Sequence, residues 1–462
     1  MDKIIIEGGR RLCGEIEVHG SKNSALPILA ATVLTGDKCE IHNCPALSDV
    51  DAAIQILRHL GCKVIRDGHT VEVDSSVITV SEIPDDLMRE MRSSIVFLGA
   101  VLARTGKAEI SSPGGCEIGL RPIDLHLSSM RKLGAEITEE HGRLYCSLGK
   151  CLHGADITLS FPSVGATENI MIAAAADGTT VITNAAREPE ISDLADFLNG
   201  CGAKISGAGD STVVIEGTKK LHGTCHTVIP DRIEASSYLI AASATGGRIC
   251  IKDVIPAHIG ALIPVLSEAG CDITTSGRWI CLSAPPRLKR VKMIRTMPYP
   301  GFPTDAQAIV GAMLSVADGT SVIIENIFES RFKHVTELMR LGAKISVEGR
   351  MAVIEGSKYL TGANVVAPDL RGGFALITAG LANGKTVITG TQHLDRGYEA
   401  PEKVLKLLGA DVRRINENDG TEKQETRQFA ENIGKPAGGS AEDCTDRHSQ
   451  EADDRYNIRQ GE

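Results

Sequence analysis

One short phrase recurs six times along this chain, and its repetition constrains the fold more than any other feature of the sequence. It reads LGCKV at 60–64 and returns as LGAEI, CGAKI, AGCDI, LGAKI and LGADV, about 70 residues later each time. A glycine directly after a helical segment suits a helix C-terminus, where a positive φ costs glycine little. We therefore expect helix ends at Gly61, Gly134, Gly202, Gly270, Gly342 and Gly409.

Each copy of the phrase has similar surroundings. An Ala/Leu/Ile-rich stretch such as SIVFLGAVLARTG comes first, followed by a β-branched run such as GTTVITNA, a helical-period segment that ends at the phrase, and a pair of strands. This order predicts six βαβαββ-like repeats in an α/β protein, with the apolar first helix of each repeat buried beneath sheets. Six copies suggest two domains of three. An open solenoid is the alternative, but its repeats usually span 20–50 residues.

Composition and charge exclude several classes of function. The chain has 462 residues and a net charge of −10, without a stripe of basic residues, so no nucleic-acid partner is expected. No apolar run reaches about 18 residues, so we expect no signal peptide, no membrane partner and a cytoplasmic location. The thirteen cysteines are scattered without zinc-site spacing, and we expect them to be reduced. The polar segment 416–462 is predicted to be a disordered tail, and its residues name no partner.

Charged residues open several of the predicted inner helices. The free N–H groups and the dipole at the N-terminus of a helix attract anions. Basic residues also lie at these helix starts or at the ends of other loops. Gathered together, the basic residues would form a binding site for a polyanion inside an acidic protein. Each one taken alone is more often a solvated surface charge, but their equivalent placement in the repeats argues for a shared site. The acids Asp231, Asp305 and Asp369 also suit simple N-caps. The basic residues are Lys22, Arg92, Arg121, Arg232, Arg331, Arg371 and Arg396.

A cysteine stands in the Pro-Gly-Gly turn of SSPGGCEIGLRP, five residues before Arg121. A free thiol titrates near about 8.5 and can donate a proton at neutral pH. A neighbouring cation would favour the thiolate. Composition alone therefore leaves Cys116 open between nucleophile and proton donor.

Nine motifs, in order, give the chain a family resemblance over residues 1 to about 415. They are SKNSALPILAATVL, PGGCEIGLRPIDLHL, SVGATENIM, NAAREPEI, PDRIEA, YPGFPTDAQA, ENIFESRFKHV, PDLRGGFAL and HLDRGYE. The chain thereby resembles the UDP-N-acetylglucosamine 1-carboxyvinyltransferases, which are enolpyruvyl transferases. The resemblance implies a two-domain inside-out α/β barrel, with residues 21–229 inserted into a domain made of 1–20 and 230–415.

The same resemblance implies a reaction. The enolpyruvyl group of phosphoenolpyruvate passes to the 3-hydroxyl of UDP-N-acetylglucosamine, and phosphate leaves, as the first committed step of peptidoglycan synthesis. No metal or organic cofactor is implied. Cys116 is similar to the acid on a loop that closes over the substrate and reacts with fosfomycin, Asp305 to the base on the sugar, and Asp369 to a residue that supports closure.

The remaining residues implied by the resemblance bind substrate. Lys22 and Arg121 correspond to phosphate-side contacts, and Arg331, Arg371 and Arg396 to carboxylate-side contacts; Lys22 and Arg396 are also counted as catalytic. The segment before SVGAT carries Phe161 and Pro162 where some members have a lysine that contacts uridine. The positions expected to contact the UDP-sugar, the uridine or the loop are Asn23, Arg92, Pro122, Asp124, Leu125, Ser163, Val164, Gly165, Asp305 and Ile327.

Two other readings stay open on the sequence. One is a shikimate-3-phosphate carboxyvinyltransferase, which shares the arginines that bind phosphoenolpyruvate. The other is a UDP-sugar-binding regulator without catalytic activity, against which the joint presence of Cys116, Asp305, Lys22 and Arg396 argues. Substrate-dependent phosphate release separates them.

Overall fold

The third repeat shows the building unit in one continuous stretch of chain. A computed structural model describes residues 2–111 and 123–416, and within it this repeat runs β10 (Asp156–Thr158), α6 (Val164–Ala174), β11 (Thr179–Thr183), α7 (Pro189–Gly200), β12 (Lys204–Ser206) and β13 (Thr212–Glu216). The sheet order is β10-β11-β13-β12, in which β10 and β11 are parallel and the other pairs antiparallel. This is the βαβαββ order expected from the sequence.

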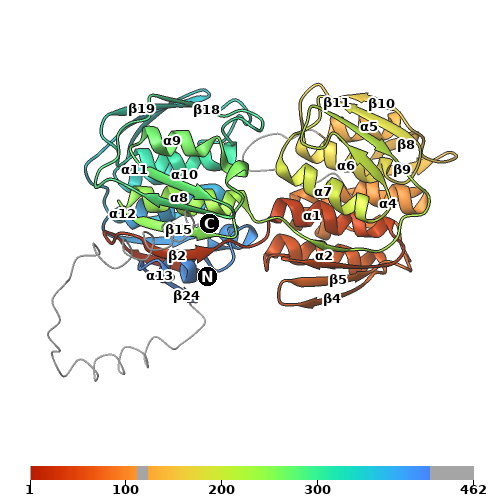
Figure 1. Ribbon diagram of the computed structural model, residues 1–462, viewed down its shortest axis with the longest axis horizontal. Helices are drawn as coiled ribbons and strands as arrows, with labels where there is room; N and C mark the ends of the chain where they lie inside the picture. The colour runs from red at the N-terminus through yellow and green to blue at the C-terminus, as the bar shows by residue number, and fades with distance from the viewer. Residues whose placement is uncertain (1, 112–122, 417–462) are drawn as a thin grey trace, which may run out of the picture. The chain divides into compact units, whose positions relative to one another are not determined.

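The other five repeats use the same two kinds of helix (Figure 1). The inner helices are α1 (Lys22–Ala31), α4 (Phe97–Thr105), α6, α8 (Arg232–Ala244), α10 (Thr304–Leu314) and α12 (Leu370–Ala382). The second helices are α2 (Ser48–Leu60), α5 (Asp124–Lys132), α7, α9 (Leu262–Glu268), α11 (Val335–Arg340) and α13 (Pro401–Leu407). Shorter helices are α3 (Asp85–Glu90) and the 3-10 turns η1 (Thr32–Leu34), η2 (Arg92–Val96), η3 (Pro256–Ile259) and η4 (Thr391–Arg396).

The described strands form six four-stranded sheets. Three contain β14 (Cys225–Thr227), β3 (Lys38–His42), β5 (Thr70–Asp74) and β4 (Lys63–Asp67); β6 (Glu82–Ile83), β7 (Lys107–Ser111), β9 (Arg143–Leu148) and β8 (Ala135–Glu140); and the strands of the third repeat. The others contain β16 (Asp272–Ser276), β17 (Trp279–Ser283), β15 (Arg248–Lys252) and β2 (Cys13–Glu17); β18 (Met293–Arg295), β19 (Thr320–Ile324), β21 (Met351–Glu355) and β20 (Lys344–Glu348); and β22 (Asn364–Val366), β23 (Lys385–Thr389), β1 (Asp2–Glu7) and β24 (Asp411–Asn416).

The repeated glycines do what their position predicts. All six have a positive φ, from 88° at Gly342 and Gly409 to 107° at Gly61. In the first repeat Gly61 is the left-handed C-cap of α2, and its N–H donates to the carbonyls of Leu57 and Arg58. A side chain at these positions would be strained, which explains why the phrase keeps its glycine in every copy.

The inner helices are buried on nearly every face, as their apolar sequences predict. In α10 every residue from Ala306 to Leu314 is buried, and α8, α10 and α12 pack against one another. In Figure 1 these three helices lie between β18–β19 on one side and β15–β2 on the other. Each fully buried large aliphatic side chain contributes roughly 1.5–3 kcal/mol. Helices inside and sheets outside give the inside-out barrel arrangement.

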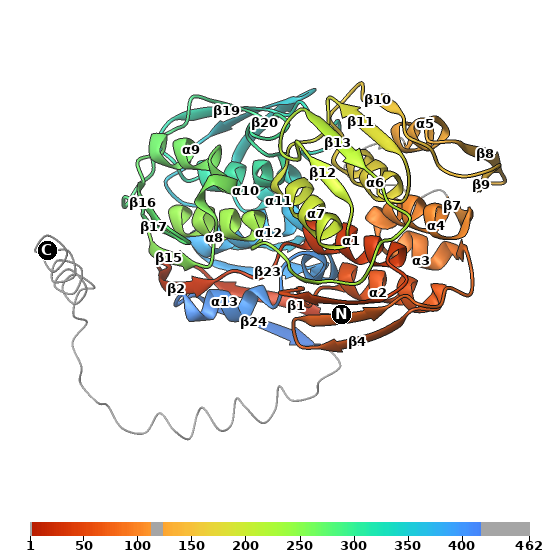
Figure 2. The ribbon, with the colours of Figure 1, turned by 45° about the vertical axis from the view of Figure 1, so that its right-hand side comes forward.

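Strands from distant parts of the chain close the two sets of repeats. The N-terminal strand β1 pairs with β23 of the last repeat, and β2 pairs with β15 of the fourth (Figure 2). Likewise β14 completes the sheet of the first repeat by pairing with β3. These long-range pairings are incompatible with an open solenoid, in which each repeat contacts only its neighbours.

The buried apolar side chains form two clusters. One draws on residues 25–228 and is called the N-terminal core; the other draws on 4–18 and 235–412 and is called the C-terminal core. Both belong to one compact unit that extends to Ile415. The boundaries at 20/21 and 229/230 stay a prediction. The predicted tail lies outside the described residues except for Asn416, the last residue of β24.

The chain passes between the cores twice, and the two passing segments touch. Ser21 N–H donates to the Ile229 carbonyl at 2.7 Å, and Asp231 N–H donates to the His19 carbonyl at 2.8 Å. A Cβ on Gly20 would lie 1.7 Å from the Asn43 carbonyl oxygen. Glycine is therefore required at this crossing by close backbone approach.

The expectation that all cysteines are reduced is wrong for one pair. Cys250 on β15 lies directly opposite Cys281 on β17, and the two are joined by a disulfide. The two strands are separated in sequence by α9 and β16, so the spacing of the cysteines along the chain does not reveal that they lie opposite each other. Among the described residues, no helix has the length and apolarity needed to cross a membrane.

Candidate active site

A buried aspartate links two of the expected basic residues. Lys22 is the first residue of α1 and is 8% exposed, and its Nζ lies 3.0 Å from Oδ2 of Asp49 in the first turn of α2. Arg396, at the end of η4, donates through Nε to the other oxygen of Asp49 at 2.8 Å. The carboxylate thus holds a lysine of the N-terminal core beside an arginine of the C-terminal core.

The electrostatics of this group favour an anionic ligand. Burial lowers the pKa of Lys22, and the positive charges of Arg371 and Arg396 lower it further, whereas Asp49 opposes that shift. Burial disfavours the charge on Asp49, yet Lys22 and Arg396 prevail and lower the pKa of that carboxyl. Lys22 and Arg396 share the single carboxylate of Asp49, so these three side chains together carry one positive charge that is not neutralised.

A second aspartate organises two more arginines. Asp305 lies in the first turn of α10, and Nε of Arg371 donates to its Oδ1 at 3.0 Å. Nη2 of Arg331 lies 3.8 Å from the same oxygen and donates to the Thr304 carbonyl at 3.3 Å. Although burial works against ionisation, Arg371 and Arg331 hold the pKa of Asp305 well below its usual range.

Arg371 is positioned by its surroundings at the start of α12. Asp369 caps this helix and accepts the N–H groups of Arg371 and Gly372, both at 3.0 Å. The guanidinium lies over the Tyr398 ring at 5.3 Å, and that ring stacks on Phe374 with centroids 4.3 Å apart. Packing and capping together fix the direction of the arginine.

Two donors of this group have no hydrogen-bond partner in the described part of the chain. Nη1 of Arg371 and Nε of Arg331 are buried, and neither makes a hydrogen bond to any residue of 2–111 or 123–416. Buried guanidinium N–H groups are almost always satisfied in folded proteins. Two such donors on arginines that lie beside the same aspartate indicate a place for a planar anion such as a carboxylate.

A further ion pair joins the two cores beside this group. Arg232, the first residue of α8, donates through Nε to Glu190 of α7 at 3.0 Å, and both side chains are buried. Asp231 caps α8 by accepting the N–H groups of Ile233 at 2.7 Å and Glu234 at 3.1 Å. A narrow crevice next to α8 and α10 is lined in part by Arg232, Tyr299 and Asp305.

The starts of α5 and α6 form a second group of expected residues. Ser163 caps α6 through its side chain, so Val164 and Gly165 are its first residues, and a Cβ on Gly165 would lie 3.3 Å from the His126 ring. The residues Asp124 and Leu125 open α5, and His126 is hydrogen-bonded to Asn169 of α6 at 3.0 Å. The two helix starts are therefore adjacent.

The other expected residues lie as follows. Asn23 follows Lys22 on α1, and the N–H of Ile327 donates to Glu325 at 2.8 Å. Arg92 begins η2, and Cys116, Arg121 and Pro122 lie outside the described residues.

The structure brings Lys22, Asp305, Arg331, Arg371 and Arg396 together and adds residues that the sequence analysis missed. Asp49 and Glu190 are the missed acids, and each pairs with an arginine of the C-terminal core. Their one signal was an acid in the first turn of a second helix, which is common to many helices. Arg396 was grouped with Arg331 and Arg371, whereas its ion-pair partner is the aspartate that binds Lys22.

Two other clusters contain side chains that bind metals. His19, His69 and Glu399 form one, and Glu40, His42 and Cys225 form the other. The residues Lys22, Asp49, Asp305, Arg331, Arg371 and Arg396 are together called the anion-binding group. Neither metal-type cluster includes any of them.

The sequence of this chain is similar to those of a known enzyme family over about nine-tenths of its length. The profile of the family described as EPSP synthase (3-phosphoshikimate 1-carboxyvinyltransferase) matches residues 6–422. The chain is 56% identical over 417 residues to UDP-N-acetylglucosamine 1-carboxyvinyltransferase 2 of Caldanaerobacter subterraneus subsp. tengcongensis, covering 90% of this chain and 100% of that protein. It is 50% identical over 418 residues to UDP-N-acetylglucosamine 1-carboxyvinyltransferase 1 of Carboxydothermus hydrogenoformans, covering 90% and 99%.

Solved structures share the fold. The enolpyruvyl transferase NikO from Streptomyces tendae superposes with a TM-score of 0.80 at 26% identity, covering 90% of this chain and 99% of that one. EPSP synthase from Acinetobacter baumannii superposes with a TM-score of 0.70 at 18% identity, covering 90% and 100%, which shows likeness of fold alone.

Proposed function

This chain belongs to the EPSP synthase family, and we propose from that premise that it transfers the enolpyruvyl group of phosphoenolpyruvate to the 3-hydroxyl of UDP-N-acetylglucosamine. Phosphate is the other product, and the reaction commits the sugar nucleotide to peptidoglycan synthesis. The observation that carries the proposal is 56% identity to a protein of that name over that protein's full length. The geometry of the anion-binding group supports it independently.

The anion-binding group fits phosphoenolpyruvate, which carries a carboxylate and a phosphate. We assign the carboxylate to Arg331 and Arg371, since each has a buried N–H group without a partner in the described part of the chain. Arginine binds a carboxylate through two parallel hydrogen bonds, which suits this end of the substrate. We assign the phosphate to Lys22 and Arg396, which Asp49 holds side by side, together with Arg121 of the loop.

The reaction adds the sugar oxygen to C2 of phosphoenolpyruvate while a proton reaches C3. In the second step a proton leaves C3, the C2–O bond to phosphate breaks, and the double bond returns. Cys116 is the proposed acid for the first proton transfer. No redox or metal step is required to balance these bonds.

Asp305 is the proposed base for the sugar hydroxyl. Its ion pairs with two arginines explain why its carboxylate is only weakly basic before the substrate binds. While Arg371 and Arg331 hold its pKa low, the carboxylate is ionised but weakly basic. A substrate carboxylate that competes for Arg371 would weaken the 3.0 Å contact and raise the basicity of Asp305. The base would thus become competent once phosphoenolpyruvate is bound.

The start of α6 is the proposed site for the diphosphate of the sugar nucleotide. Ser163, Val164 and Gly165 present backbone N–H groups at a helix N-terminus, and such a terminus binds phosphate without a basic side chain. The proposed contacts to uridine are Asp124, Leu125 and Pro122, and the proposed contacts to the sugar are Asn23 and Ile327. Arg92 is proposed to contact the UDP-sugar or the loop. Asp369 is proposed to support closure of the site.

Two wider assignments follow from the same family reading. We propose that residues 21–229 form one domain and that 1–20 with 230–415 form the other, a division supported by the two buried clusters. We also propose a cytoplasmic location, where both substrates of the reaction are made.

Phosphate release from phosphoenolpyruvate tests the proposal. The full chain is assayed with UDP-N-acetylglucosamine and, separately, with shikimate 3-phosphate, the substrate class named by the family description. Release with the sugar nucleotide alone is expected. Release with shikimate 3-phosphate alone would move the enzyme to the other branch of the family, and release with neither would favour a binding protein.

A variant sharpens the assignment of the base. Asp305→Asn is expected to lower kcat by at least about 100-fold, because it removes a proton acceptor while keeping the shape of the side chain. The matched control Asp253→Asn changes an exposed aspartate that pairs with Arg278 and should leave kcat unchanged. Equal kcat values for the two variants would refute the role of Asp305.

A further inference from the structure

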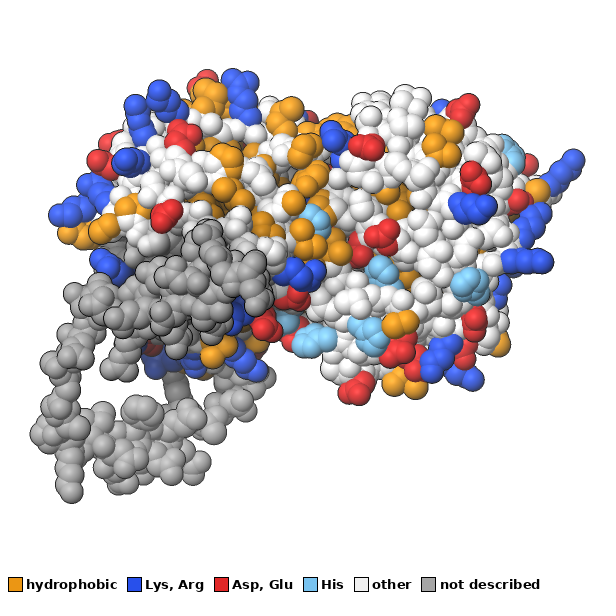
Figure 3. Space-filling view, viewed as in Figure 1, with side chains coloured by type: hydrophobic (Ala, Val, Ile, Leu, Met, Phe, Trp, Pro, Cys, Tyr) orange, Lys and Arg blue, Asp and Glu red, His pale blue; other side chains and the backbone are white. Residues whose placement is uncertain are grey.

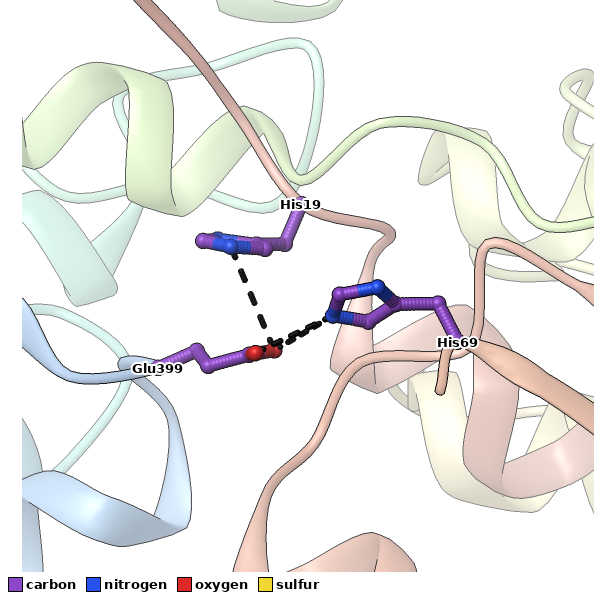
Figure 4. A group of neighbouring side chains, drawn as sticks. All are labelled: His19, His69 and Glu399. Atoms are coloured by element: carbon purple, nitrogen blue, oxygen red, sulfur yellow. Dashed lines mark hydrogen bonds and ion pairs between the residues drawn. The ribbon is translucent and has the colours of Figure 1, made fainter. Parts of the chain in front are cut away.

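Three side chains of metal-binding type converge from three separate segments (Figure 4). His19 lies between β2 and α1, His69 lies in the turn between β4 and β5, and Glu399 lies between η4 and α13. Nε2 of His69 is 3.0 Å from both oxygens of Glu399, and Nε2 of His19 is 4.0 Å from Oε2 of Glu399. One ligand atom from each residue lies within 4.8 Å of the others.

The His19 ring is held by a buried carboxylate behind it. Nδ1 of His19 lies 3.0 Å from Oε1 of Glu234, and Oε2 of Glu234 accepts the backbone N–H of His19 at 2.9 Å. Glu234 lies on α8 and is 3% exposed. An ionised carboxylate can only accept, so Nδ1 of His19 donates to Glu234, and Nε2 is the nitrogen that is directed toward Glu399. This is the outer-shell arrangement that orients metal-binding histidines.

The carboxylate of Glu399 is also held in place. Its Oε2 accepts the backbone N–H of Ala46 at 2.8 Å, across from the His69 ring. The rings of His19 and His69 have centroids 5.7 Å apart, and in Figure 4 the His19 ring lies above the Glu399 carboxylate and the His69 ring to its right. Nε2 of each ring is therefore directed at the carboxylate of Glu399, and an ion bound there would displace the proton that His69 donates to that carboxylate.

We propose that His19, His69 and Glu399 bind one divalent zinc-type cation, with water as its fourth ligand. Two imidazoles and a carboxylate form a ligand set that Zn²⁺ accepts in tetrahedral geometry with bonds of about 2.0–2.2 Å. Such bonds place the donor atoms roughly 3.3 Å apart, between the 3.0 and 4.0 Å separations found here. Small side-chain rotations would suffice.

The position of the cluster gives the ion a definite effect on the fold. His69 lies in the turn that joins β4 and β5 of the N-terminal core, and Glu399 follows Arg396 by three residues in the C-terminal core. A bound ion would join the β4–β5 turn to the loop that follows Arg396. The side chains remain 23–47% exposed, so an ion can enter from solvent, and Figure 3 shows histidine and acidic side chains gathered on one face.

The second metal-type cluster provides an internal control. Glu40 and His42 lie on β3 and Cys225 lies on the neighbouring β14. Nε2 of His42 is 3.6 Å from Oε1 of Glu40, and Glu40 and Cys225 are exposed. No buried carboxylate among the described residues is found behind its histidine. Any zinc bound there would have a thiolate ligand, which Co²⁺ reports as an intense near-ultraviolet absorption.

Equilibrium dialysis of the full chain against Zn²⁺ tests the proposal, with Co²⁺ spectra as a second readout. The wild-type chain and the control His42→Gln are expected to bind one ion at this site with equal affinity. His69→Gln and Glu399→Gln are expected to weaken binding by more than about 100-fold, and Glu234→Gln by roughly 10–100-fold through loss of orientation. The Co²⁺ absorption of this site should lack the thiolate band.

Several outcomes would overturn the proposal. Unchanged affinity in both His69→Gln and Glu399→Gln would do so, as would loss of binding in His42→Gln alone or no binding by the wild-type chain at millimolar Zn²⁺. His69 is half-exposed, so His69→Gln is expected to fold, and an unchanged thermal midpoint without metal verifies this. Because no substrate enters the experiment, its result is independent of the proposed reaction.

Discussion

The two cores have the same architecture but begin their inner helices with different chemistry. In the C-terminal core, α8, α10 and α12 start with Arg232, Asp305 and Arg371, and each of these charges is paired. In the N-terminal core, α6 starts with Ser163 and then buries Glu168, whose charged neighbours Glu190 and Glu188 are also acidic. The C-terminal core thus has a paired charge in the first turn of all three inner helices, whereas the N-terminal core has the cation Lys22 at the start of α1 and backbone donors at the start of α6.

The largest effect is expected where the two cores share one charge. Asp49→Asn leaves Lys22 and Arg396 without their common partner, and breaking a buried ion pair costs about 3–5 kcal/mol. Asp51→Asn is the matched control, since Asp51 occupies the same helical turn and pairs with Arg66 at the surface, a contact that contributes about 0–1 kcal/mol. Urea unfolding measures both variants, and equal losses would show that the bridge is not a stabilising link.

The next effect concerns the cationic helix start of the C-terminal core. Arg371→Lys keeps the positive charge but loses the planar pair of donors, so kcat/KM should fall by about 10²–10³-fold. Steady-state kinetics with phosphoenolpyruvate provide the measurement. Arg340→Lys, on the exposed side of α11, should have no effect. If the two variants behaved alike, the assignment of the substrate carboxylate to Arg371 would fail.

A smaller effect, of opposite sign, is expected in the N-terminal core. Burial, with Glu190 and Glu188 nearby, raises the pKa of Glu168 to about 8. Between its ordinary pKa of 4.5 and pH 8, the unfolded state loses this proton while the folded state keeps it, so stability falls as pH rises.

Glu168→Gln should remove that loss. We expect it to stabilise the fold by on the order of 2 kcal/mol at pH 8, less than the full shift implies because the amide is still buried. Thermal unfolding should show the gain at pH 8 and none below pH 4.5. A gain that is equal at both pH values would point to packing rather than ionisation.

The smallest effect tests the uncharged helix start itself. Ser163→Ala removes the cap that accepts the Ala166 N–H at 3.4 Å, and losing such a cap costs about 1 kcal/mol. The KM for UDP-N-acetylglucosamine should rise only a few-fold, because the backbone donors of Val164 and Gly165 remain. Loss of sugar-nucleotide binding altogether would mean that the hydroxyl, rather than the backbone, carries the contact.

The sequence predicted the parts of the molecule that repeat. Periodicity located six helix ends, and each of the glycines has the positive φ that the pattern required. The buried inner helices followed from their lack of a polar face. Both inferences depend on local chemistry, which a single sequence displays directly.

Features that depend on long-range register stayed hidden. Asp49 was missed because its partner Arg396 lies 347 residues away, and nothing local distinguishes it from Asp51. The bond between Cys250 and Cys281 was missed because it needs the alignment of two strands that are not consecutive. Likewise, His19 and Glu399 have meaning only once the cores are assembled.

The placement of β1 and β2 has a consequence for biosynthesis. These first strands complete the sheets of the sixth and fourth repeats, so β2 must wait for β15 (Arg248–Lys252) and β1 must wait for β23 (Lys385–Thr389) before its partner exists. The N-terminal core is finished when β14 emerges and can fold meanwhile as a unit. A nascent chain therefore carries the strand DKIIIE, with its three isoleucines and its backbone groups unpaired, for most of its synthesis.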